Sequence, residues 1–165
     1  MFSLRSHIRR SCTLIHMRSP KLIRIAAALL LLLSPCLAQS EQEKAQIEVD
    51  VLAVMARQSA AWNRGDIAGY MDGYWRSPDL VFASGDQITR GWQPTLDRYK
   101  KSYDTKAKMG QLTFSDIDVN VLSKDVAVVL GSWSLAREKD NPKGKFTVIF
   151  RRLKEGWRII HDHTS

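Results

Sequence analysis

The sequence predicts an α+β domain in which a cone-shaped, curved antiparallel sheet wraps around a long N-terminal helix and two shorter helices. Three observations predict this fold class. Apolar residues recur at helical spacing over residues 45–63, whereas from residue 111 onwards they alternate as they do in strands. Short polar segments divide these strands, and short connections join antiparallel neighbours. A long helix across the concave face of the sheet leaves an interior pocket for a small ligand.

The helices are predicted in the first half of this domain. The long helix over residues 45–63 carries an apolar ladder at Ile47, Val51, Val54 and Ala61. It ends before Gly65, which can adopt the left-handed conformation that closes a helix. Asp66 is the predicted N-cap of a short helix over residues 67–74. Pro94 suits the first turn of a third helix.

The strands follow in two groups. Residues 79–91 predict two short strands around a turn at Gly85. Four longer strands are then expected at residues 111–122, 126–136, 146–153 and 157–164. The polar stretch "REKDNPKGK", residues 137–145, is expected to be a solvated hairpin loop.

The N-terminal segment is predicted to be a secretory signal peptide. Residues 21–38 have a basic start, an apolar run over 25–33, and small residues Cys36 and Ala38 before a cleavage site. That run is shorter than the roughly 20 residues that span a bilayer, so no stable membrane anchor is expected after cleavage. Translation is expected to start at Met17. The predicted organisation is a signal peptide over 1–38, a flexible segment over 39–44 and one secreted or periplasmic domain over 45–165.

Charge and cysteine content restrict the function classes of that domain. Six of the 25 basic residues and none of the 17 acidic residues lie in the leader, so the formal charge falls from +8 to about +2 without it. Nucleic-acid binding is therefore not expected. Both cysteines, Cys12 and Cys36, lie in the leader, which excludes a disulfide, a thiolate nucleophile and cysteine-ligated zinc from the domain. No phosphate-binding loop or dinucleotide fingerprint occurs, so no cofactor is expected.

The terminal strand holds the candidate catalytic residues. Alternation places Trp157, Ile159, His161 and His163 on one face, and Arg158, Ile160, Asp162 and Thr164 on the other. Asp162 inside the pocket would be a poorly solvated carboxyl with a raised pKa, suited to act as a general acid or base. His161 and His163 inside would instead titrate near neutral pH. A third interpretation places both histidines on the outer face, at a dimer interface.

Several motifs resemble one superfamily. "AWNRGD" closes the first helix, Gly91 follows the hairpin, and "GWRIIHDHTS" forms the last strand. These features resemble the nuclear-transport-factor-2-like superfamily, and within it the SnoaL-like, ketosteroid-isomerase-like group, over residues 45–165. The last strand is also similar to that of the calcium/calmodulin-dependent kinase II association domain. The resemblance implies a cone with an interior pocket and, commonly, a homodimer formed through the outer sheet face.

The resemblance also suggests which residues line the pocket. A steroid isomerase of this fold would need a tyrosine and an aspartate where this sequence has Gln58 and Ser84, so that activity is not expected. Similarity to the kinase association domain favours an inward Asp162 and Thr164, with Trp133 and Thr147 on neighbouring strands. The predicted ligand-binding residues are Gln58, Trp62, Trp133, Thr147 and Thr164. Gly131, which lacks a side chain, is expected to leave room for a ligand or another backbone beside Trp133.

Three functions remain open from the sequence. The first is a binding domain for a small, partly apolar molecule, with a possible cofactor-free isomerisation, dehydration or cyclisation by Asp162 or a terminal-strand histidine. The second is a non-catalytic association module that forms oligomers. The third is a metal-dependent enzyme, which would need carboxylates beside His161 and His163 to complete a ligand set; no metal site is assigned.

Overall fold

The computed structural model describes residues 20–165, with side chains described from residue 39 onwards. Ser40–Ser165 form a compact unit of their own. Much of the predicted signal peptide, residues 1–19, lies outside the described residues, and residues 20–38 are described only as the start of a helix. Within the part of the chain that is described, no helix is both long and apolar enough to cross a membrane.

Helix α1 (Pro20–Asn63) extends further upstream than the predicted start at residue 45. It continues through Pro35; a proline removes one helical hydrogen bond but need not end the helix. From Ile47 onwards the predicted apolar ladder is buried against the sheet. Gly65 has a φ of 89°, as expected of a residue that closes a helix.

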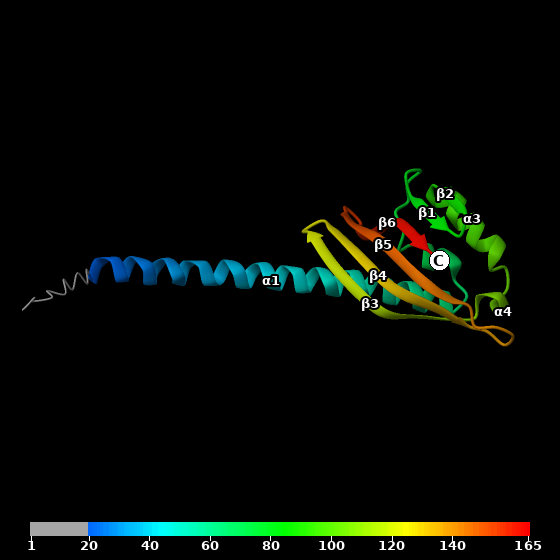
Figure 1. Cartoon of the computed structure of the whole chain (residues 1–165). Coiled ribbons are helices and arrows are strands. Elements are labelled where there is room, and N and C mark those ends of the chain that lie inside the picture. Colours follow the sequence, from blue (N-terminus) through cyan, green and yellow to red (C-terminus); the bar gives the residue numbers. More distant parts are fainter. Residues whose placement is uncertain (1–19) are drawn as a thin grey trace, which may run out of the picture. The chain divides into compact units, whose positions relative to one another are not determined.

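Helix α2 (Ile67–Met71) is shorter than the predicted segment over 67–74, and Asp66 caps it as predicted. Helix α3 (Trp92–Ser102) begins two residues before Pro94. A further short helix, α4 (Lys106–Met109), was not predicted; the Thr105 hydroxyl accepts a hydrogen bond from the Lys108 amide at its start. Figure 1 shows α3 beside the two short strands.

The six predicted strands form one curved, unclosed sheet with the order β2-β1-β6-β5-β4-β3 (Figure 1). Their bounds are β1 (Val81–Ser84), β2 (Gln87–Arg90), β3 (Gln111–Ser123), β4 (Val126–Ala136), β5 (Lys143–Leu153) and β6 (Gly156–Thr164). Strand β5 begins inside the loop predicted over 137–145. The pairing of β1 with β6 is parallel, whereas every other pair is antiparallel. No short hairpin joins β1 to β6, so the connection rule that predicts antiparallel neighbours does not apply to them.

A β-bulge in β6 corrects the predicted alternation of the last strand. Phe150 pairs with Ile159 while its neighbour Ile149 pairs with His161, which leaves Ile160 without a partner on β5. The extra residue reverses the alternation. The residues buried on the inner face are therefore Trp157 and Ile159 before the bulge, and Asp162 after it. His161 and His163 do not share a face with Trp157 and Ile159.

Candidate functional site

An interior cavity lies between the helices and the concave face of the sheet. Its volume is about 230 Å³. Nine of its twenty lining residues are aromatic, among them Trp62, Tyr99, Tyr103, Phe114 and Phe146. An engineered apolar cavity of about 150 Å³ holds a benzene molecule, so this one is large enough for a ring with a short substituent.

Asp162 is the carboxyl group in the cavity wall. Its side chain is almost fully buried, at 3% exposure. The Tyr74 hydroxyl donates to Oδ2 at 2.7 Å, and the Thr164 hydroxyl donates to Oδ1 at 2.7 Å. Burial raises the pKa of Asp162, and these two hydrogen bonds oppose that shift without cancelling it. A buried carboxyl with a raised pKa in a ligand-sized cavity is a candidate general acid or base.

Tyrosine hydroxyl groups surround this carboxyl. The hydroxyls of Tyr70 and Tyr74 lie 3.3 Å apart, so a hydrogen-bonded chain leads from Tyr70 through Tyr74 to Asp162. Burial, reinforced by the charge of Asp162, raises the pKa of Tyr70 to about 12. Burial likewise raises the pKa of Tyr74 and of Tyr99 well above the ordinary value. The three phenols therefore stay neutral near physiological pH and can donate hydrogen bonds.

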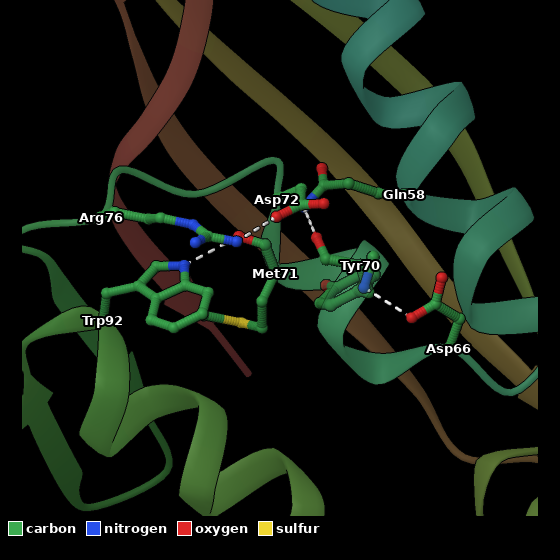
Figure 2. Close-up of polar contacts among 8 residues, drawn as sticks. Gln58, Asp66, Tyr70, Met71, Asp72, Arg76 and Trp92 are labelled. Atoms are coloured by element: carbon green, nitrogen blue, oxygen red, sulfur yellow. Dashed lines mark hydrogen bonds and ion pairs between the residues drawn. The ribbon is translucent and has the colours of Figure 1, made fainter. Parts of the chain in front are cut away.

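Contacts from both flanking helices hold α2, which carries Tyr70, in place. Figure 2 shows the Gln58 amide of α1 donating to the carbonyl oxygen of Tyr70, and the Trp92 indole of α3 donating to the carbonyl oxygen of Met71. These distances are 3.1 Å and 2.9 Å. Asp66 caps the first turn of the same helix. These contacts hold the backbone of α2 in place and thereby position the Tyr70 side chain.

Four of the five predicted ligand-binding residues line the cavity, namely Gln58, Trp62, Trp133 and Thr164. Each of them already donates a hydrogen bond within the protein. The Gln58 amide nitrogen contacts α2, the Trp62 indole donates to the carbonyl oxygen of Met109 at 3.1 Å, and the Trp133 indole donates to that of Ser165 at 3.1 Å. The two indoles therefore contribute shape and apolar surface to the cavity rather than free donors.

Thr147, His161 and His163 do not line the cavity. Thr147 is exposed on β5 between Phe146 and Val148, whose side chains point inwards, so the prediction for Thr147 is corrected. His163 pairs with Thr147 on the outer face and is exposed, while His161 is half-buried there. Within the described side chains, no three His, Cys, Asp or Glu residues lie close enough to hold a metal ion.

The space beside Gly131 is occupied by the protein itself. A Cβ at this position would lie 2.5 Å from a ring carbon of Phe146 and 2.7 Å from Cδ1 of Ile117. The missing side chain therefore allows these two residues to pack, and does not leave room for a ligand as predicted.

The cavity residues that were not identified from the sequence include Tyr70, Tyr74 and Arg98. The separation of Tyr70 and Tyr74 by four residues was a usable signal, because side chains at that spacing meet on one helical face. Arg98 had no such signal, since α3 carries basic residues on several sides.

Comparisons with known proteins show which family and which solved structures share this fold. The family model described as the SnoaL-like domain matches residues 51–165. A search among curated proteins finds no match. A crystal structure of a nuclear-transport-factor-2-like protein of unknown function from Shewanella oneidensis MR-1 is 39% identical, with a TM-score of 0.69, over 72% of this chain and 98% of that one.

Two more distant structures share the fold. A nuclear-transport-factor-2-like superfamily protein from Salmonella enterica serovar Typhimurium is 18% identical, with a TM-score of 0.60, over 74% of this chain and 92% of that one. A Xanthomonas campestris protein provisionally described as a calcium/calmodulin-dependent protein kinase II association domain is 18% identical, with a TM-score of 0.56. The match covers 70% of this chain and 84% of that one. At these identities the likeness shows the fold alone.

Proposed function

Because the chain belongs to the SnoaL-like domain family of the nuclear-transport-factor-2-like superfamily, as its motifs predicted, we propose that its cavity binds a small, partly apolar molecule and that Asp162 moves a proton on it. Membership alone does not transfer an activity, since one fold serves many functions. The observation that carries the proposal is the buried Asp162 carboxyl, with its raised pKa, in the wall of a ring-sized cavity.

The proposed chemistry is cofactor-free acid–base catalysis. Asp162 takes a proton from a carbon next to a carbonyl group, or returns one to it. Isomerisation, dehydration and cyclisation can all use this step. The neutral phenol of Tyr99 lines the same cavity and is a hydrogen-bond donor for the substrate oxygen that gains charge, whereas the single Tyr70 proton is donated to Tyr74. The aromatic walls exclude water and orient the ring.

Binding is tested with neutral ring compounds and a pair of variants. Phenylacetone and cyclohexanone are titrated into the purified protein, and their NMR signals report binding. Val148→Phe places a larger side chain in the cavity and should abolish binding. Ile149→Phe adds a similar volume at the next residue, on the opposite face of β5, and should leave binding unchanged. Equal binding to the two variants would contradict a ligand site in this cavity.

Catalysis is tested by exchange of the hydrogens next to the carbonyl of bound phenylacetone with deuterium from D₂O. The protein should accelerate this exchange, and Asp162→Asn should remove the acceleration, because an amide cannot accept the proton. Asp116→Asn changes an exposed carboxyl on the outer face and is the matched control. Acceleration that survives in Asp162→Asn would assign the proton transfer to another group.

A second proposal concerns association through the outer face of the sheet. Leu122 and Leu130 are 58% and 49% exposed on this face, which favours contact with a second copy of the chain. We propose a homodimer formed there, with His163 and Thr147 near the contact. Light scattering should give twice the protomer mass for the protein and a monomer for Leu130→Lys. A monomeric wild-type protein would contradict this proposal.

The location of the protein is a further proposal, which rests on residues 1–38 alone. The basic start, the apolar run and the small residues before residue 39 support export from the cytoplasm and cleavage after Ala38. N-terminal sequencing of the protein from a secreting host should begin at Gln39. A chain that remains in the cytoplasm with its leader attached would contradict export.

A further inference from the structure

Arg98 carries a positive charge at the edge of the cavity. It lies on α3, is half-buried and lines the same cavity as Asp162. The β1–β2 hairpin holds its guanidinium: Nη1 donates to the Thr89 hydroxyl at 3.0 Å, and Nη2 donates to the carbonyl oxygen of Ser84 at 3.4 Å. The group also lies over the Phe82 ring, 4.9 Å from its centroid. Its position is therefore fixed before any ligand arrives.

Among the described side chains, this guanidinium has no carboxylate partner. Four other arginines of the described chain, namely Arg64, Arg76, Arg137 and Arg152, each form an ion pair with an aspartate. Within the part of the chain that the structure describes, no carboxylate lies within 4.0 Å of Arg98. A guanidinium has five N–H donors, and the two contacts with the hairpin leave donors free for a ligand.

Asp162 does not neutralise Arg98, although both groups belong to one cavity. Phe82 and Asp162 are paired residues on β1 and β6, and the Phe82 ring lies under the guanidinium. The Asp162 carboxylate oxygens instead accept from Tyr74 and Thr164. The cavity thus has a free cation in one part of its wall, an acid–base group in another, and aromatic surface around both.

We propose that Arg98 binds the carboxylate of the ligand, and that the ligand is a small monocarboxylate with a ring. This inference rests on the proposed function, and it names the substrate class. A planar guanidinium binds a planar carboxylate through two parallel hydrogen bonds. Arg98 is the one Lys or Arg residue among the described cavity-lining residues, so its charge balances a monoanion but leaves one negative charge of a phosphate dianion unbalanced.

The size and walls of the cavity specify the rest of the ligand. A volume of about 230 Å³ admits one ring with a short chain, and the aromatic walls favour an apolar ring. With the carboxylate at Arg98, the remainder of the molecule extends over Phe82 towards Asp162 and Tyr70. A carbonyl or hydroxyl group at that end would meet the acid–base group.

The test compares ring carboxylates with their neutral amides. Benzoate, phenylacetate, 3-phenylpropionate and cyclohexanecarboxylate are titrated into the purified protein, each beside its primary amide, and NMR reports the dissociation constants. At least one acid should bind about tenfold or more tightly than its amide, because the amide keeps the shape but lacks the charge that pairs with Arg98.

Two arginine variants assign that preference to one side chain. Arg98→Gln should remove the preference for the acid while the amide binds as before, and Arg98→Lys should keep part of it. Arg76→Gln is the matched control, because Arg76 also lies over a ring, that of Trp92, but outside the cavity. Arg76→Gln should retain the full preference.

The outcomes separate this inference from the proposed function. Amides that bind as tightly as acids, or a preference that survives Arg98→Gln, would overturn the inference and leave a neutral-ligand cavity. If no acid, amide or ketone binds, both the inference and the proposed function fail.

Discussion

Two aspartates on opposite faces of the sheet have similar partners and opposite properties. Asp162 faces the cavity and accepts hydrogen bonds from Tyr74 and Thr164. Asp116, at a bulge in β3, accepts from the Ser132 hydroxyl at 2.7 Å and from the Lys145 ammonium at 3.4 Å. Burial raises the pKa of Asp162, whereas the hydrogen bonds from Ser132 and Lys145, with the lysine charge, lower the pKa of exposed Asp116.

The difference shows that solvent access, more than the number of hydrogen bonds, decides what a carboxyl can do. Two donors of similar geometry are not enough to keep a buried carboxylate as stable as water does. On the outer face a neighbouring cation and water together favour the charged form. The inner face is therefore suited to proton transfer and the outer face to solvation or association.

The largest expected difference between the two faces concerns packing. Trp62→Ala removes a ring that contacts Tyr70 and Tyr103 edge-on, with centroids 5.1 Å and 4.7 Å away. We expect it to lower the free energy of unfolding by about 3–5 kcal/mol. Leu130→Ala on the outer face should cost less than about 1 kcal/mol in the monomer. Urea unfolding measures both, and equal costs would remove the distinction between a packed inner face and a solvated outer face.

A smaller difference is expected for the hydrogen bonds to the two aspartates. Tyr74→Phe removes the donor to Oδ2 of Asp162 where no water replaces it freely, and should cost about 1.5–3 kcal/mol. Ser132→Ala removes the donor to Asp116 at the surface, and should change stability by less than about 0.5 kcal/mol. A negligible cost for Tyr74→Phe in urea unfolding would mean that water reaches Asp162.

The smallest and most diagnostic effect is the pH dependence of stability. Since the folded-state pKa of Asp162 is raised, the folded protein binds more protons than the unfolded one above pH 3.8, and its stability falls as pH rises through the folded pKa. The Asp162→Asn variant has no carboxyl at this position and so does not lose stability in this way as pH rises. Its stability relative to wild type should therefore increase from pH 4 to pH 7.

Asp116→Asn should show the opposite trend. The folded-state pKa of Asp116 is lowered, so its contribution to stability is present above pH 3.8 and is lost as pH falls through the folded pKa. The variant should therefore lose stability relative to wild type as pH rises from 3 to 5. Unfolding curves for both variants at matched pH values give the comparison. Trends of the same sign would contradict the assigned environments.

Local sequence patterns predicted most of the fold. Apolar periodicity and turn residues located the long helix from residue 47 onwards, its end before Gly65, the Asp66 cap and all six strands. They missed the parallel pairing of β1 with β6, because these strands meet only after the intervening elements have folded. They also missed α4, a helix too short for a periodic signal.

The site was less predictable because it depends on contacts between distant segments. Alternation was assigned as if β6 were unbroken, but the bulge at Ile160 depends on its pairing with β5. Tyr74 and Asp162 meet across 88 residues of sequence. Arg98 is distinguished by its position over Phe82 at the cavity edge, which no local sequence pattern records.

Titration of the Asp162 side-chain carboxyl by ¹³C NMR tests the central claim most directly. The Asp162→Asn variant assigns the signal, and the Asp116 carboxyl provides an internal reference in the same sample. Burial in the cavity predicts a titration midpoint for Asp162 above the ordinary value of 3.8, and one for Asp116 below it. A midpoint for Asp162 at or below 3.8 would show a well-solvated carboxylate, and would contradict its role as a buried acid–base group.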